Sequence, residues 1–167
     1  MTVSSAPVLA LKGITKRFGP VVANRSVSWT LAAGRIYALL GENGAGKSTL
    51  MSILAGRYQP DDGAIELKGR PVRFHSPARA LAAGIGMVYQ RFMLVEPLSV
   101  AENILLHRGP IRLAGANQTS RMRELAERYG LAVDPLAPVR SLSMGERQRV
   151  EILKLLHRQA EILVFDE

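Results

Sequence analysis

The sequence predicts an α/β fold in which a core sheet is joined to an N-terminal antiparallel β part and an inserted α-helical subdomain. Three observations predict it. Strand-like segments fill the first half of the chain, helical spacing prevails after Gln90, and a strand-like apolar run returns at the end. The glycine-rich stretch 41–46 also stands between an apolar run and a helix, which indicates a strand–loop–helix unit in the first half.

The residues before Gln90 alternate or run apolar in short segments that turn residues separate. We expect strands over 8–12, 26–31, 35–40, 65–68, 72–74 and 85–89. The turn between the first two strands lies at Phe18-Gly19-Pro20. A helix over 48–55 follows the glycine-rich loop, and Ser76 is placed to cap a short helix over 77–83.

After Gln90, apolar residues recur at helical intervals. We expect helices over 99–106, 120–129 and 143–157. The run from Glu161 to Phe165 is typical of a buried strand, and it ends on the two acids Asp166 and Glu167. A mostly helical part, from about residue 92 to 158, therefore interrupts the sheet.

Composition limits the class of protein. Hydrophobic residues make up 47% of the 167 residues and charged residues 22%, as in ordinary globular proteins. The formal net charge is +8, but the arginines are scattered and aromatic residues reach only 5%, so we expect no nucleic-acid partner. The lack of cysteine excludes a disulfide framework and thiolate metal sites. No signal-type start and no long apolar run are present, which favours a cytosolic location.

The segment Gly41-Glu42-Asn43-Gly44-Ala45-Gly46-Lys47-Ser48 matches the P-loop pattern for nucleotide phosphates. Its glycines let backbone N–H groups curl around a phosphate at the positive end of a helix dipole. Lys47 would bring a positive charge to the β- and γ-phosphates, and the Ser48 hydroxyl suits Mg²⁺. The pattern predicts a site for nucleotide phosphates and Mg²⁺, with a chance glycine-rich turn as the alternative.

The two acids at the end of the chain would lie at the carboxyl edge of a strand, where open α/β sheets bind ligands. Asp166 is a candidate Mg²⁺ ligand that acts through water, and Glu167 is a candidate general base that polarises an attacking water. Taken alone, such a pair indicates a solvated strand end. Beside a P-loop, it favours the role in metal binding and catalysis.

The segment Leu142-Ser143-Met144-Gly145-Glu146-Arg147-Gln148-Arg149 begins the last predicted helix. Ser143 and Glu146 have the spacing of a capping box, which is a structural role. A serine hydroxyl and a glycine amide at a helix N-terminus can also bind an anion. The segment resembles the LSGGQ-type signature of ATP-binding cassette (ABC) ATPases, with Met144 in place of the usual glycine.

The resemblance covers essentially the whole chain and implies roles for further residues. Phe18 matches the aromatic residue that stacks on adenine in this family, although a buried core phenylalanine is the alternative. Gln90 matches the Q-loop glutamine, a contact of Mg²⁺ and water that couples the site to the membrane subunit. Thr49 matches the second P-loop hydroxyl, which contacts the α-phosphate.

The implied fold is a P-loop NTPase core sheet of the ABC ATPase type. Its parts would be a β-rich P-loop core over residues 1–91, a helical subdomain over 92–158 and a Walker-B strand over 159–167. In this family two cassettes pack head to tail, and each ATP lies between one P-loop and the partner's signature. The residues that would serve the partner's ATP are Ser143, Met144, Gly145 and Glu146.

The stretches 84–95, 98–104 and 148–154 resemble bacterial importers of nucleosides and simple sugars, with ribose-type importers as the near alternative. Their ATPases are tandem proteins, and this chain resembles the first cassette. The resemblance implies transmembrane permease subunits and a second cassette as partners and, indirectly, an extracytoplasmic solute-binding protein. It implies a peripheral location at the cytoplasmic face of the membrane.

A cassette of this family continues past the two acids to a D-loop and a switch histidine. We therefore expect the chain to be truncated after the Walker-B strand and to turn over less than about one ATP per second by itself. Two alternatives stay open, a soluble ABC ATPase outside transport and a nucleotide-binding module without activity. The lack of sustained heptads after Gln90 argues against the soluble ATPases of DNA repair or translation.

Overall fold

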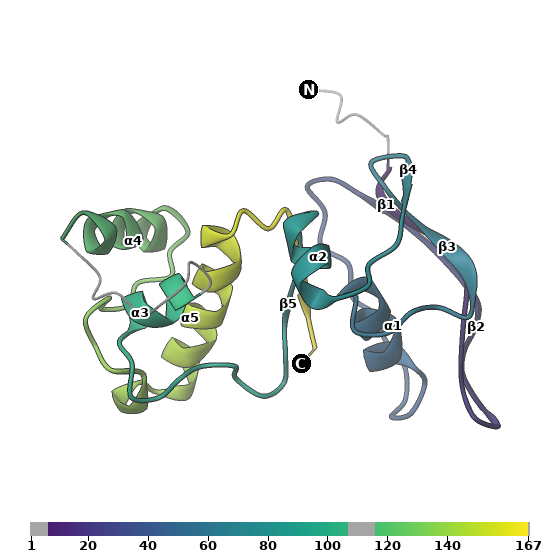
Figure 1. The fold of residues 1–167 in the computed structure, drawn as a ribbon, viewed down its shortest axis with the longest axis horizontal. Coiled ribbons are helices and arrows are strands. Elements are labelled where there is room, and N and C mark those ends of the chain that lie inside the picture. The colour runs from purple at the N-terminus through teal and green to yellow at the C-terminus, as the bar shows by residue number, and fades with distance from the viewer. Residues whose placement is uncertain (1–6, 107–115, 167) are drawn as a thin grey trace. The chain divides into compact units, whose positions relative to one another are not determined.

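The computed structural model describes residues 7–106 and 116–166 (Figure 1). Contacts within the chain form two compact units, Met1–Ala80 and Leu81–Glu167. The short helix α2, Pro77–Ala82, crosses the division between them, and the Ser76 hydroxyl accepts from the Arg79 N–H at 3.3 Å, as expected of its cap. None of the helices in the described ranges is long and apolar enough to cross a membrane.

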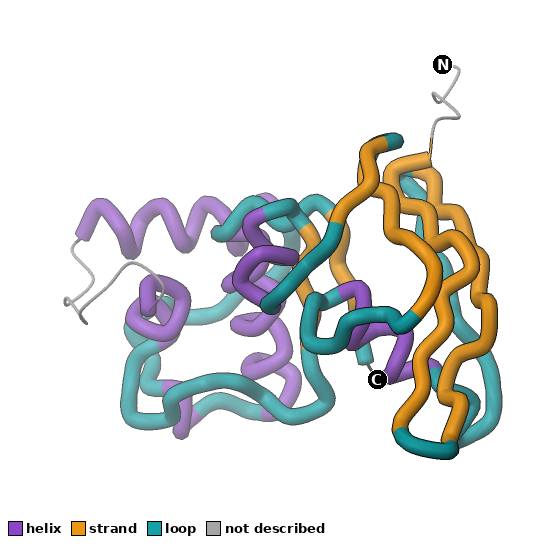
Figure 2. The backbone as a smooth tube through the Cα atoms, turned by 45° about the vertical axis from the view of Figure 1, so that its right-hand side comes forward, coloured by secondary structure: helices purple, strands orange, loops and turns teal. Residues whose placement is uncertain are grey.

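The first unit contains a four-stranded sheet in which every neighbouring pair is antiparallel, drawn in orange in Figure 2. Its strands are β1 (Pro7–Phe18), β2 (Val21–Ala32), β3 (Asp62–Leu67) and β4 (Arg70–Val72). Their order in the sheet is β2-β1-β3-β4. The predicted N-terminal antiparallel part is confirmed, and β1 and β2 extend to the Gly19-Pro20 turn because their pairing continues to Phe18 and Val21.

Apolar side chains from the sheet and from the helix α1 (Lys47–Leu54) are buried in this unit. Leu9, Leu11 and Ile14 of β1 are at most 1% exposed, and Ile53 of α1 is 1% exposed. β1 lies between two other strands, β2 and β3, which pair with its backbone groups. α1 confirms the helix predicted after the glycine-rich loop.

The strand predicted over 35–40 is wrong for this chain. The segment has no regular secondary structure, and Ile36 and Leu40 are 102% and 88% exposed. A strand needs a neighbour for its N–H and C=O groups, and none of the described strands pairs with this segment. Its attachment is instead through Tyr37, whose hydroxyl accepts from the Ala32 N–H at 2.8 Å and whose ring packs edge-on against Trp29.

The second unit combines a two-stranded parallel sheet with helices. The strands are β5 (Ile85–Val88) and β6 (Ile162–Phe165), and the helices are α3 (Val100–Leu105), α4 (Ala116–Arg128) and α5 (Met144–His157), with a 3₁₀ turn over Val139–Ser141. The two strands and the three α-helices were predicted, with ends shifted by a few residues, whereas the 3₁₀ turn was not. Residues 107–115, between α3 and α4, lie outside the described part.

One apolar cluster joins the helices of the second unit, which lie together in Figure 1. Its buried members are Val100, Ala101, Ile104, Met122, Ala126, Val139, Leu142, Val150 and Leu153. α5 also packs directly on β5. A Cβ atom on Gly86 would lie 2.9 Å from the Leu155 side chain and 3.1 Å from the Ala160 methyl group, so a larger residue at this position would force the Leu155 side chain to shift.

Two helices of this unit begin with the same capping box. At α3, the Ser99 hydroxyl accepts from the Glu102 N–H at 3.3 Å, and the Glu102 carboxylate accepts from the Ser99 hydroxyl at 2.7 Å and from its N–H at 2.8 Å. The hydrogen bonds from the Ser99 hydroxyl and N–H lower the pKa of the Glu102 carboxyl. The charged carboxylate therefore stabilises the start of α3.

This cap makes stability depend on pH. Because the pKa of Glu102 is lowered on folding from an ordinary value of 4.5, its contribution is present above about pH 4.5 and is lost as the pH falls through the lower folded-state pKa. Glu102→Gln should lower the free energy of unfolding by about 0.3 to 1 kcal/mol at pH 7. The difference, measured by urea unfolding, should shrink as the pH falls through that lower folded-state pKa. Glu127→Gln, on the exposed side of α4, is the control, and a difference that does not vary with pH would contradict the assignment.

Candidate functional site

The glycine-rich loop over 41–46 leads directly into α1. Gly44 and Gly46 have φ angles of 85° and 84°, a left-handed conformation that glycine adopts without steric cost. The Ala45 N–H donates to the Glu42 carbonyl at 3.2 Å, and the Leu50 N–H donates to the Gly46 carbonyl at 3.0 Å. The loop therefore makes a tight turn that leads into the first turn of α1, and its residues 41–44 are exposed.

β2 sets the position of this loop. A Cβ atom on Gly46 would lie 2.1 Å from the Ala23 carbonyl oxygen, a distance that no side chain tolerates. Asn24 is 5% exposed on the same strand, and its Nδ2 donates to the Gly46 carbonyl at 3.1 Å. Only glycine at position 46 lets the loop lie this close to the sheet.

The chemistry of the loop fits a polyphosphate. Lys47 Nζ donates to the carbonyls of Gly41 and Glu42, at 2.6 and 2.8 Å, so the backbone at the start of the loop holds the ammonium group in place. The first N–H groups of an α-helix have no partner within the helix, and α1 has neither a side-chain cap at Gly46 nor an acid in its first turn. The Lys47 ammonium and the N–H groups of the first turn of α1 thus lie at the same end of the helix. Ser48, in that first turn, adds a hydroxyl, which is a hard oxygen ligand for Mg²⁺.

An aromatic and cationic cluster closes the end of β1. Phe18 is 42% exposed as a residue, and its ring meets the Tyr58 ring edge-on, with centroids 5.3 Å apart. Lys16 Nζ lies 5.5 Å from the centroid of Phe18 and is paired at 2.8 Å with Asp61, whose pKa it lowers. The alternative of Phe18 as a buried core residue is therefore wrong, because a large part of its ring is accessible.

In the second unit, Gln90 and Asp166 follow neighbouring parallel strands at the same edge. β5 and β6 pair in register from Ile85 with Ile162 to Val88 with Phe165, and the Asp166 N–H donates to the Val88 carbonyl at 3.2 Å. Gln90 is exposed and Asp166 half-buried. Glu167, the candidate general base, lies outside the described residues.

No group of three His, Cys, Asp or Glu side chains within the described ranges could hold a metal ion. A Mg²⁺ ion that binds together with a nucleotide needs few protein ligands, because phosphates and water supply most of its oxygens. The candidate Mg²⁺ ligands Ser48, Gln90 and Asp166 are of that kind: one hydroxyl, one amide and one carboxylate. Each of these residues offers an oxygen atom, the donor that Mg²⁺ prefers.

The signature-like segment forms the N-terminus of α5, and the predicted capping box is confirmed. The Ser143 hydroxyl accepts from the Glu146 N–H at 3.3 Å, and hydrogen bonds from Ser143 lower the pKa of Glu146. Met144 is 77% exposed. A Cβ atom on Gly145 would meet nothing within 4 Å, and its φ is not in the left-handed region, so the fold of this chain does not itself require glycine there.

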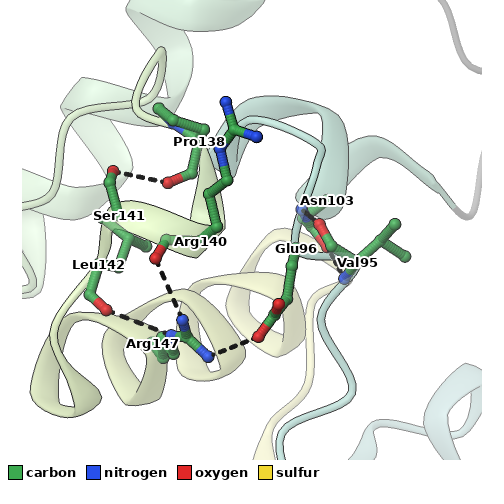
Figure 3. Close-up of polar contacts among 8 residues, drawn as sticks. All are labelled: Val95, Glu96, Asn103, Pro138, Arg140, Ser141, Leu142 and Arg147. Atoms are coloured by element: carbon green, nitrogen blue, oxygen red, sulfur yellow. Dashed lines mark hydrogen bonds and ion pairs between the residues drawn. The ribbon is translucent and has the colours of Figure 1, made fainter.

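The Arg147 side chain holds the residues just before Ser143 in place, a role that was not predicted from the sequence (Figure 3). Its Nε donates to the Leu142 carbonyl at 3.2 Å and its Nη2 to the Arg140 carbonyl at 3.3 Å. Its Nη1 pairs with Glu96 at 3.0 Å. One guanidinium thus connects the chain before Ser143 with the chain that follows Gln90, an arrangement suited to its fixed fork of donors.

Further along α5, Glu151 and Lys154 make polar contacts with the backbone of Met93, which the sequence reasoning also missed. Glu151 is 7% exposed although it is an acid. The sequence contains a pattern that could have indicated the burial of Glu151. An acid beside Val150 and three residues before a lysine, on the apolar side of a helix, indicates a buried ion pair.

Residues 24–167 match the protein family described as ABC transporter. The chain is 50% identical over 163 residues to the nucleoside import ATP-binding protein NupA of Lactococcus lactis subsp. cremoris, covering 96% of this chain and 32% of that protein. It is 50% identical over 165 residues to the ribose import ATP-binding protein RbsA 1 of Rubrobacter xylanophilus, covering 96% and 33%. The chain thus spans about a third of the length of these curated relatives.

The fold is shared with a solved structure, cbiO1 from Clostridium perfringens, described as part of the ABC transporter complex cbiONQ. The TM-score is 0.81 and the identity 24%, over 98% of this chain and 66% of that one. This likeness confirms the predicted fold class, and the family match confirms the resemblance on which it rested. The chain belongs to the ABC transporter family.

Proposed function

We propose that this chain binds Mg²⁺-ATP through its P-loop and that, within the intact protein, it belongs to the ATPase that energises solute import. The observation that carries the proposal is the loop over 41–46, which holds the Lys47 ammonium at a helix start without a side-chain cap. The signature-like segment on α5 separates this family from other P-loop proteins and supports the same function.

Each candidate residue has a role in this proposal. N–H groups of the P-loop and Lys47 bind phosphate oxygens, Ser48 and Thr49 contribute hydroxyls, and the Phe18 ring stacks on the base. The proposed ATP-binding residues are Phe18, Gly41, Asn43, Gly44, Ala45, Gly46, Lys47, Ser48 and Thr49.

ATP hydrolysis supplies the free energy for transport, and the acids of the second unit would prepare its water. Asp166 and Gln90 would hold Mg²⁺, which would stabilise negative charge on the phosphates, and Gln90 would also contact the attacking water. Glu167 accepts a proton from that water, because a carboxylate at the carboxyl edge of a strand is placed to act as a general base. The proposed motif-based division into residues 1–91, 92–158 and 159–167 assigns these acids to the last strand.

The signature residues would act on the ATP that a second cassette binds. Ser143 and Gly145 lie at the exposed N-terminus of α5, where a hydroxyl and N–H groups can face an anion. The open space beside Gly145 supports this role, because a glycine that the chain does not itself require leaves room for a close partner. Met144 and Glu146 complete the segment.

The relatives support a solute class. NupA is named for nucleoside import and RbsA 1 for ribose import, so we propose a nucleoside or a simple sugar as the cargo of the intact protein. Its partners would be transmembrane permease subunits, a second cassette and, indirectly, an extracytoplasmic solute-binding protein. The location would be peripheral, at the cytoplasmic face of the membrane.

Lys47→Ala should weaken ATP binding by the intact protein, because the loop then loses the positively charged side chain that it holds beside the start of α1. We expect the dissociation constant for Mg²⁺-ATP to rise at least about a hundredfold, the loss typical of a charged contact with phosphate. Equilibrium binding of a fluorescent ATP analogue measures it. Arg70→Ala removes an exposed cation on β4 and is the matched control. Unchanged binding by Lys47→Ala would refute the phosphate site.

Ser143→Ala and Ser99→Ala separate a cap from a ligand. Both serines cap a helix with the same capping box, so both substitutions should cost about 1 kcal/mol of stability. Only Ser143→Ala should lower kcat for ATP in the intact protein, by about tenfold or more, while its own P-loop still binds ATP. Equal turnover by the two variants would mean that Ser143 is only a cap.

The transport function predicts a membrane partner. The intact protein, solubilised from membranes in mild detergent, should co-purify with a polytopic subunit, because an importer ATPase works on a permease. Purification of an affinity-tagged form, with mass spectrometry of the co-purifying chains, tests this. An intact protein that stays in the soluble fraction and binds no such subunit would favour a soluble ABC ATPase instead.

A further inference from the structure

The chain between β5 and α3 has no regular secondary structure from Tyr89 to Leu98. Its backbone N–H and C=O groups therefore depend on partners outside a helix or sheet ladder. Gln90 is the second residue of this segment. The groups that hold the segment decide where the Gln90 side chain leaves the carboxyl edge of β5.

α5 supplies the first anchor, a closed ring of polar contacts on Met93. Glu151 Oε1 accepts from the Met93 N–H at 2.6 Å, and Lys154 Nζ donates to the Met93 carbonyl at 2.8 Å. The two side chains are themselves paired at 3.2 Å. Both backbone groups of one residue are thus bound by one turn of α5.

The anchor is polar and not a hydrophobic contact. The Met93 side chain is 67% exposed, so α5 holds the backbone of this residue and leaves its side chain in solvent. Glu151, in contrast, is 7% exposed. A buried carboxylate is costly unless it is paired and hydrogen-bonded, and Glu151 meets both conditions only with Lys154 and the Met93 N–H in place.

Two further contacts hold the same segment. Asn103, 1% exposed on α3, accepts from the Val95 N–H at 2.8 Å and donates to the Val95 carbonyl at 3.0 Å. Glu96 pairs with Arg147 at 3.0 Å (Figure 3). Anchors at three of four consecutive residues fix the course of the chain after Gln90. Of these, the Met93 anchor lies closest to Gln90 in the sequence.

We propose that Glu151 and Lys154 are positioning residues for Gln90. Resting on the proposed function, this assigns them no contact with ATP or Mg²⁺. By binding the Met93 backbone, they hold the end of β5 so that the Gln90 amide is presented at the strand edge beside Asp166. Because they lie on the helix that begins at Ser143, α5 holds the Gln90 segment and the signature segment in one packed body.

The first test needs no nucleotide. Hydrogen–deuterium exchange of the intact, nucleotide-free protein should show the Met93 amide exchanging about tenfold faster or more in Glu151→Ala than in the wild type, because its acceptor is gone. Glu151→Gln keeps an acceptor oxygen and should restore most of the protection. Glu127→Ala on α4 is the control. Unchanged exchange at Met93 in Glu151→Ala would overturn the anchor.

The second test measures ATP turnover in the same intact protein. Glu151→Ala should lower kcat about fivefold to tenfold, while the dissociation constant for ATP without Mg²⁺ stays within about twofold, because the P-loop is untouched. Lys154→Met, which keeps the packing of the lysine stem, should act in the same direction. This second variant keeps the test decisive if Glu151→Ala folds poorly.

A double-mutant cycle with Gln90→Ala decides whether the pair acts through Gln90. If it does, Glu151→Ala combined with Gln90→Ala should turn over ATP no more slowly than Gln90→Ala alone. Multiplying effects, or a normal kcat for Glu151→Ala, would overturn the proposal. If the wild type hydrolyses no ATP, or if Gln90→Ala has no effect, the proposed function of the site fails instead, and the exchange result still decides the anchor.

Discussion

The contact between Leu155 on α5 and Gly86 on β5 is the constraint on which the second unit depends. Because a Cβ atom on Gly86 would lie 2.9 Å from the leucine, the glycine lets the helix lie close to the strand without displacing the Leu155 side chain. With α5 held there, Val150 and Leu153 reach the apolar cluster with α3 and α4, and the signature-like segment occupies the far end of the same helix.

The helices α3 and α5 begin with side-chain caps, whereas α1 begins without one. α3 and α5 begin with serine–glutamate capping boxes, in which side chains satisfy backbone N–H groups. α1 begins at Gly46 with a left-handed glycine, no side-chain cap and no acid in its first turn. A capped start is stable by itself, whereas an uncapped start beside Lys47 favours an anion from outside. The helix start at the P-loop thus differs from those of α3 and α5 in two ways: it has no side-chain cap or acid, and it carries a lysine.

Much of the fold was predictable because local signals agreed with tertiary structure. Ser143 and Glu146 have the spacing of a capping box, and the structure makes that box. The segment 35–40 shows the limit. Its apolar run predicts a strand, but a strand exists only with a neighbour, and none of the described strands pairs with it. The pairing of Arg147 with Glu96 and the contact of Glu151 with the Met93 backbone were beyond prediction, because each joins residues more than fifty positions apart.

The sequence by itself determined the chemistry: the P-loop at 41–48, the signature-like segment at 142–149 and the family to which both belong. These are local patterns, and each depends on residues within a few positions of one another. Only the tertiary structure decided which side chains hold them. It showed that Ala23 and Asn24 set the place of Gly46, and that α5 holds the backbone at Met93. Such contacts form only when distant segments pack, so residue spacing along the chain does not encode them.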